Sequence, residues 1–217
     1  TKGNTLTING GNVENNGALT VSAATTFENV ALKNNGTIEG SFTLNGGSYG
    51  FDVKEDATSD AKVNGTITLV GSVNLDVDVS NVTSAEKLTF AEAVTGNGEW
   101  THNLTNNIFN VNISEGKNAL EFAAKSAEDI AADTGASSSQ AAGVNAIISG
   151  GTEDTGNASF EAVAGEVQSL MQSSNKADVA KALEMVDKMS SDLSNAVTAS
   201  VVANNAQVLA AVGSRFT

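Results

Sequence analysis

The chain has 217 residues and a formal net charge of −14, with 25 acidic residues against 11 Lys and Arg. Such an acidic composition argues against a nucleic-acid-binding protein, because phosphate contacts require Lys and Arg side chains. The absence of Cys excludes disulfides and thiolate metal sites, and no apolar run is long enough for a transmembrane helix. Because the sequence begins with Thr1, we expect a fragment or a processed product.

The front half consists of short strand-like segments separated by Asn-Gly turns. Asn and Gly tolerate the positive φ angles that chain corners need, and they recur at 15–17, 34–36 and 64–65. Between the turns, apolar and polar residues alternate, most regularly where Val73, Leu75, Val77 and Val79 are separated by polar residues. Alternation of this kind predicts strands with one side in a core and the other in water.

The spacing of the turns predicts a right-handed parallel β-helix, a solenoid, over residues 1–81. Gly36 follows Gly17 after 19 residues, and Gly65 follows Gly36 after 29. An irregular repeat with few aromatic and many small polar residues is more typical of stacked coils than of a β-sandwich. Coils stacked in register would align Asn side chains, which could hydrogen-bond to one another in ladders.

Residues 82–122 are predicted to form a β-hairpin cap over one end of the solenoid. The alternating runs here are interrupted by turn residues at 96–98 and 105–107. An uncovered solenoid end exposes unpaired strand edges, so a cap protects the chain from aggregation. The expected cap core consists of Trp100, Leu104, Phe109, Val111 and Ile113.

Residues 123–217 are predicted to form an α-helical tail. Apolar residues recur at helical spacing in segments that begin near Ser126, near Ser137, before Phe160 and before Val179. A last segment begins after Ser190 and has small residues on almost all sides, which is typical of a helix surrounded by protein. Its expected apolar positions, the linker helix, are Leu193, Val197, Val201, Val208, Leu209 and Val212.

The order of three motifs in this tail resembles the passenger-to-barrel junction of classical type V autotransporters from Gram-negative bacteria. The first motif is an Ala-rich helix start containing Gln at 137–144, and the second is the segment 180–186. The third is a small-residue helix that includes 205–209 and ends in Ser214-Arg215-Phe216. The second motif departs from the family pattern, because 187–190 replaces its Ser-Gly-Glu ending.

The resemblance implies a non-catalytic passenger stalk that supports secretion, passenger folding and adhesion at the cell surface or outside the cell. An outer-membrane β-barrel in cis, absent here, would be a partner, and the linker helix would enter its pore. Residues 82–122 would act as an autochaperone-like cap that nucleates passenger folding. A host or matrix surface and self-association are further expected interactions, and no cofactor is expected.

Catalytic and metal-binding interpretations rest on few residues. His102 is the only histidine, and it lies in an alternating run where a strand role is favoured over a Ser-His-Asp site. Asp52, Asp56, Asp76 and Asp78 could offer oxygens to Ca²⁺, but a solvated face is favoured because no calcium-binding loop accompanies them.

Two alternative functions stay open at this point. The chain could be a self-assembling subunit of an extracellular fibre or surface layer. It could also be a β-helical polysaccharide-acting enzyme with a groove lined by Asp52, Asp76 or Asp78, although Trp100 and Tyr49 are the only Trp and Tyr available to stack on sugar.

Overall fold

The computed structural model describes residues 5–149, 158–173 and 175–190. The chain divides into two compact units, Thr1–Lys125 and Ser126–Thr217. Each unit is described by itself.

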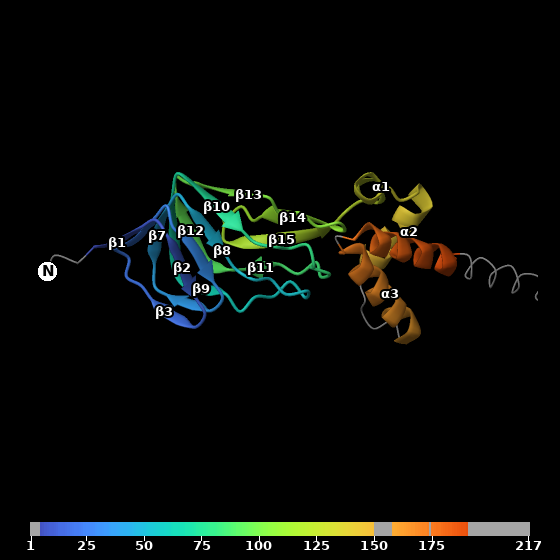
Figure 1. Cartoon of the computed structure of the whole chain (residues 1–217), viewed down its shortest axis with the longest axis horizontal. Coiled ribbons are helices and arrows are strands. Elements are labelled where there is room, and N and C mark those ends of the chain that lie inside the picture. Colours follow the sequence, from blue (N-terminus) through green and yellow to red (C-terminus); the bar gives the residue numbers. More distant parts are fainter. Residues whose placement is uncertain (1–4, 150–157, 174, 191–217) are drawn as a thin grey trace, which may run out of the picture. The chain divides into compact units, whose positions relative to one another are not determined.

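The first unit is a stack of coils built mainly from parallel strands (Figure 1). One sheet has the order β1-β4-β7-β9-β6-β3, with β12 also paired to β9, and a second has the order β13-β10-β8-β5-β2. The strands of the first sheet are β1 (Leu6–Asn9), β3 (Ala18–Thr20), β4 (Thr25–Glu28), β6 (Thr37–Glu39), β7 (Phe42–Asn45), β9 (Lys62–Val70) and β12 (Ala91–Gly96). Those of the second are β2 (Asn12–Asn15), β5 (Ala31–Asn34), β8 (Ser48–Gly50), β10 (Ser72–Asp76) and β13 (Glu99–His102).

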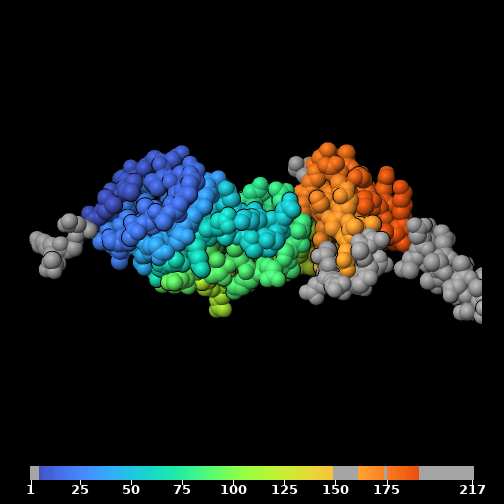
Figure 2. All heavy atoms as spheres, turned by 90° about the horizontal axis from the view of Figure 1, so that it is seen from below, coloured from blue at the N-terminus to red at the C-terminus, as the bar shows by residue number. Residues whose placement is uncertain are grey.

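Every pairing within these two sheets is parallel and joins strands of successive coils. In the space-filling view, bands of the unit follow one another in chain order (Figure 2). The expected parallel β architecture is therefore confirmed, and it is compatible with a solenoid-like fold.

The coils differ in length because only some of them carry long corners. Asn15 and Asn34 occupy equivalent positions 19 residues apart, whereas Asn64 and Glu39 are 25 apart and Thr68 and Thr95 are 27 apart. The additional residues lie in the connections 51–61 and 77–87, outside the strands. The predicted step from Gly36 to Gly65 is wrong, because a Cβ on Gly65 would meet the backbone of Gly40.

Columns of apolar side chains fill the interior of the stack. One column runs Val13, Leu32, Tyr49 and Leu75, one residue from each successive coil. A second column consists of Leu19, Ile38, Val63 and Ala91. Alternation along each strand gives these positions to the core, and parallel pairing keeps them in line from coil to coil. As predicted, Val73, Leu75, Val77 and Val79 are buried.

A small antiparallel sheet follows the coils. It consists of β11 (Leu88–Thr89), β15 (Ala119–Ala124) and β14 (Phe109–Ile113), in that order. The hairpins expected over 82–122 are only partly present: β14 and β15 pair as a hairpin, but β12 and β13 each pair in parallel with the preceding coil. The corner at 96–98 resembled a hairpin turn, yet Gly98 donates its N–H to Leu69 of the coil below.

The described residues of the second unit are mainly helical, as predicted. It contains α1 (Ala127–Thr134), α2 (Ser138–Ser149) and α3 (Ala158–Met171), and residues 176–190 are also helical. Ser126 caps α1 by accepting the N–H of Asp129, and Gly135 ends it with a φ of 73°. None of the helices in the described ranges is long and apolar enough to cross a bilayer.

Glycine lets the 176–190 segment approach α2. A Cβ on Gly143 would collide with the side chain of Val186, which is itself 2% exposed. Nearby, Gln140 donates to the carboxylate of Asp187 over 2.8 Å. The predicted linker-helix residues lie outside the described residues: Leu193, Val197, Val201, Val208, Leu209 and Val212.

Candidate functional site

The last coil is covered by the turn that joins β14 to β15, which we call the closing turn (residues 114–118). Asn118 donates from Nδ2 to the carbonyl oxygens of Ala91 and Glu92, over 3.1 and 3.2 Å. Its own backbone oxygen accepts the N–H of Phe90 at 3.0 Å. The closing turn thus satisfies backbone groups of the last coil that no further coil takes up.

Lys117 fastens the closing turn to the neighbouring corner. Its Nζ donates to the Gly98 carbonyl over 2.9 Å and lies 3.0 Å from the Glu99 carboxylate. Its backbone oxygen accepts the indole N–H of Trp100 over 2.8 Å. The side chain is held at this corner by hydrogen bonds in addition to its exposed ion pair, which alone would contribute little.

Beneath the closing turn lies a cluster of aromatic rings from three coils. The Trp100 centroid is 6.1 Å from both Tyr49 and Phe90, and Phe51 is 5.2 Å from Phe90. Tyr49 and Phe90 are 0% exposed and Trp100 is 8% exposed. The interior of the stack near the closing turn is therefore filled by rings, which favour tilted and edge-on contacts of this kind.

The five residues predicted as the cap core come from different elements of the first unit. Trp100 belongs to the last coil, and Phe109 packs edge-on against Phe122 at 6.4 Å. Leu104, Val111 and Ile113 are only half-buried. Residue composition could not reveal the hydrogen-bonding roles of Lys117 and Asn118, which have no motif.

A second buried polar residue, Asn106, lies between the 77–87 connection and the start of β14. Its Nδ2 donates to the carbonyls of Val79 and Val82, and its Oδ1 accepts the N–H groups of Ile108 and Phe109. Asn106 is 5% exposed, and these hydrogen bonds join the 77–87 connection to the start of β14. Buried polar groups are stable when satisfied in this way.

The predicted Asn ladder is present in the first coils. Asn15, 7% exposed, donates to the Oδ1 of Asn34, 0% exposed, over 2.7 Å. Asn34 in turn donates to the Tyr49 hydroxyl over 3.3 Å. Burial raises the pKa of the Tyr49 hydroxyl above its usual range, and the hydrogen bond from Asn34 opposes that effect. The ladder therefore ends on a phenol that stays neutral.

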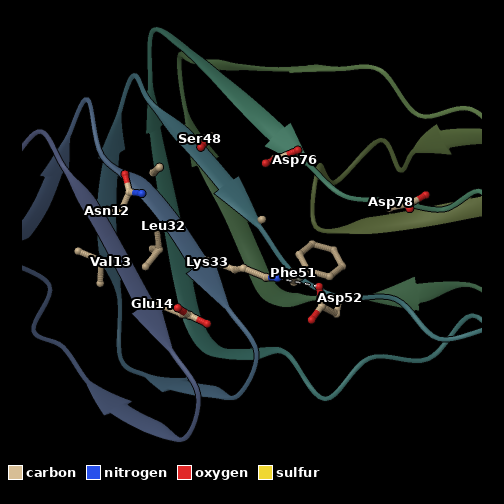
Figure 3. A pocket seen from close by; sticks show the side chains of 12 residues that line it. Asn12, Val13, Glu14, Leu32, Lys33, Ser48, Phe51, Asp52, Asp76 and Asp78 are labelled. Atoms are coloured by element: carbon tan, nitrogen blue, oxygen red, sulfur yellow. Dashed lines mark ion pairs between the residues drawn. The ribbon is translucent and has the colours of Figure 1, made fainter.

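Three of the predicted acidic residues do share a shallow groove (Figure 3). The groove has a volume of 360 Å³, runs across β2, β5, β8 and β10, and is lined by Asp52, Asp76 and Asp78 together with Glu14 and Lys33. Lys33 and Asp52 form an exposed ion pair of 3.1 Å. The remaining carboxylates make this surface acidic.

The acidic residues do not assemble into a metal site. Within the described ranges, no three His, Asp or Glu side chains come together as metal ligands. The Asp78 carboxylate accepts the hydroxyl and N–H of Ser80, which lower the pKa of Asp78, and Thr58 has the same effect on the pKa of Asp56. Both carboxylates act as local turn acceptors.

His102 is exposed at the end of an interior column. It pairs in register with Leu75 and lines a shallow hollow with Glu99, Trp100 and Lys117. A catalytic triad would need a nucleophile and a carboxylate hydrogen-bonded to the His102 ring. In the structure, His102 is the last residue of strand β13 and lies beside the closing turn.

No protein family, curated protein or solved structure matches this chain. The site geometry and the resemblance of the tail therefore carry the functional proposal.

Proposed function

We propose that this chain is part of a non-catalytic passenger stalk of an autotransporter, displayed at the surface of a Gram-negative cell. Its first unit would be a right-handed parallel β-helix whose last coils and closing turn fold first and template the others. The helical unit would lead to an outer-membrane β-barrel in cis. Adhesion to a host or matrix surface would be the task of the outward faces.

The observation that carries this proposal is the asymmetry of the stack. Lys117 and Asn118 take up the carbonyl groups of Gly98, Ala91 and Glu92 at the last coil, and the interior beside them is filled with aromatic rings. A stack closed at its C-terminal end, next to the helical unit in sequence, suits folding that starts there as the chain leaves the cell. Inward positions hold packed side chains, so the body of the stack supplies rigidity.

The proposal is tested by display. The chain is placed between a secretory signal peptide and an autotransporter barrel, and trypsin is applied to intact cells. We expect surface-exposed protein whose first unit resists the protease. Asn118→Ala removes the hydrogen bonds to Ala91 and Glu92 and should reduce the resistant fraction several-fold.

Asn110→Ala is the matched control, because Asn110 is an exposed residue of β14. Its resistant fraction should equal that of the parent chain. Retention inside cells whose barrel exports an unrelated passenger would reject the proposal, and so would equal protease resistance in Asn118→Ala and Asn110→Ala.

One observation favours a second candidate, a polysaccharide-acting enzyme. Asp52, Asp76 and Asp78 line one groove, and the lowered pKa of Asp78 suits the ionised member of a carboxylate pair. Reducing-sugar release from a polysaccharide panel measures this activity. Release that disappears in Asp76→Asn/Asp78→Asn would support the enzyme, and release that is absent or unchanged would reject it.

A further inference from the structure

The end of the stack opposite the closing turn, formed by β1, β2 and β3, has the features of an unfinished coil interface. We call it the open end. Each of these strands occupies a terminal position in its sheet and, in the part of the chain that the structure describes, pairs along one edge only. Three strand edges therefore present unpaired N–H and C=O groups together.

The interior columns are incomplete at the open end. Val13, Leu19 and Ile8 are half-buried, whereas their partners in the next coil, Leu32, Ile38 and Phe27, are at most 1% exposed. Ile8, Val13 and Leu19 line a hollow of 430 Å³. Leu6, on the same coil, is 53% exposed, whereas its partner in the next coil, Thr25, is 3% exposed.

The glycine corners show the same difference between the open end and the interior. A Cβ on Gly36 would collide with the backbone of Gly17, because the corner of one coil rests directly on the corner before it. A Cβ on Gly17 would meet no atom within 4 Å. The corner at Gly36 is therefore in contact with a preceding corner, and the corner at Gly17 has open space at the equivalent position.

We infer that the open end is a docking surface for one further parallel coil, carrying Asn over Asn15 and a chain corner over Gly17. The occupant is fixed by continuity with the interface that already joins the coils: parallel pairing on all three strands, apolar columns and a buried Asn ladder. The occupant is a strand-turn segment with the chemistry of 6–24, supplied in cis, as each described coil of the stack is. This inference concerns stacking alone and stands independently of secretion.

A second copy of the chain does not fit the open end equally well. Two copies meeting at their open ends would be related by a two-fold axis, which reverses the direction of every strand across the junction. The strands would then pair antiparallel, and the Asn15 positions and corners would lose the register seen between coils. In an end-to-end contact in the same direction, the open end would meet the closing turn, which already occupies the Ala91 and Glu92 carbonyls.

A tandem duplication tests the inference. A copy of residues 6–24 is inserted before Leu6, which reproduces the 19-residue register that separates Asn15 from Asn34. The chain has no Cys, so Leu6→Cys provides a unique thiol for Ellman's reagent. We expect this thiol to react at least tenfold more slowly in the duplicated chain than in the parent.

Gly17→Ala gives a second readout that depends on stacking. In the parent chain it should leave the urea midpoint unchanged, and in the duplicated chain it should lower the midpoint as much as Gly36→Ala does. An insert of the same composition in scrambled order is the control and should not protect Leu6→Cys. A copy with its Asn15 equivalent changed to Ala should protect Leu6→Cys less.

Two results would overturn the inference. One is an unchanged thiol reaction rate in the duplicated chain. The other is protection of Leu6→Cys in the parent chain that rises with protein concentration together with dimer in sedimentation, which would assign the open end to a second copy. Both are measured on purified protein, so a failure of secretion would not affect them.

Discussion

The Nδ2 of Asn15 donates to the Oδ1 of Asn34 over 2.7 Å, between side chains that are 19 residues apart in sequence and nearly closed to solvent. The same Oδ1 of Asn34 also accepts the N–H of Gly36 at 3.4 Å, which ties the ladder to the chain corner. Coil stacking in this protein is therefore held by polar contacts inside an otherwise apolar column.

Asn34→Ala should destabilise the first unit by about 1–3 kcal/mol, because it leaves buried polar groups of Asn15 and Tyr49 with fewer partners. Urea unfolding monitored by Trp100 fluorescence measures the change. Asn16→Ala is the control: Asn16 is exposed, and its loss should change the unfolding free energy by less than about 0.5 kcal/mol. Equal effects of the two variants would contradict a stabilising role for the buried ladder.

Gly36→Ala should cost about 1–3 kcal/mol of stability, because the new Cβ collides with the Gly17 backbone and the coils must move apart. Gly17→Ala should be close to neutral, since open space surrounds its Cβ position. Urea midpoints measured for both variants test this expectation. If chain corners were generally intolerant of alanine, the midpoint would fall in both variants rather than in Gly36→Ala alone.

Tyr49 should remain protonated in the folded protein at about pH 11, one unit above the ordinary tyrosine pKa of about 10. A pKa that is raised on folding contributes stability below the unfolded value, and this contribution is lost as pH rises above it. Tyr49 is the only tyrosine, so absorbance at 295 nm reports it alone. In the urea-unfolded chain, we expect the pH titration of tyrosinate absorbance to have its midpoint near the ordinary tyrosine pKa. In the folded protein, we expect that midpoint to be higher.

The unfolding free energy should accordingly fall with rising pH beyond about 10, and Tyr49→Phe should reduce that slope. A native-state titration with an ordinary midpoint would show that the hydroxyl is reached by solvent.

Gly143→Ala should destabilise the helical unit in spite of the higher helix propensity of alanine, because its Cβ meets the Val186 side chain. Gly165→Ala in α3 is the matched substitution: its Cβ position is open, and it should stabilise the unit by up to about 1 kcal/mol. Thermal melts of helical circular dichroism measure both. The same sign of shift in both variants would be inconsistent with close packing at Gly143.

The strands and helices could be predicted from sequence because each depends on local spacing. Alternation at Val73, Leu75, Val77 and Val79 places these side chains inside, and Ser126 and Gly135 delimit α1 by the conformations that they favour. The 19-residue step between Gly17 and Gly36 was visible because that coil has short corners throughout.

The later register and most of the cap could not be predicted in the same way. The connections 51–61 and 77–87 lengthen the coils, so Gly65 stacks on Gly40 and the repeat disappears from the sequence. A glycine-rich corner such as 96–98 has the same composition in a hairpin and in a coil. Asn118 and Asn106 resemble the many other Asn residues of the chain until the partners of their amides are known.

The long connections have a consequence for how this architecture tolerates change. Coils of 19 and of 27 residues contribute strands to the same parallel sheet, because the additional residues lie in the connections outside the strands. Insertion at such a corner alters neither the direction nor the register of the strands on either side, and loop length affects closure entropy only slowly. The exposed stretches within these connections, 54–56 and 85–86, are therefore positions at which a recognition loop can be added while the buried side chains of the stack keep their contacts.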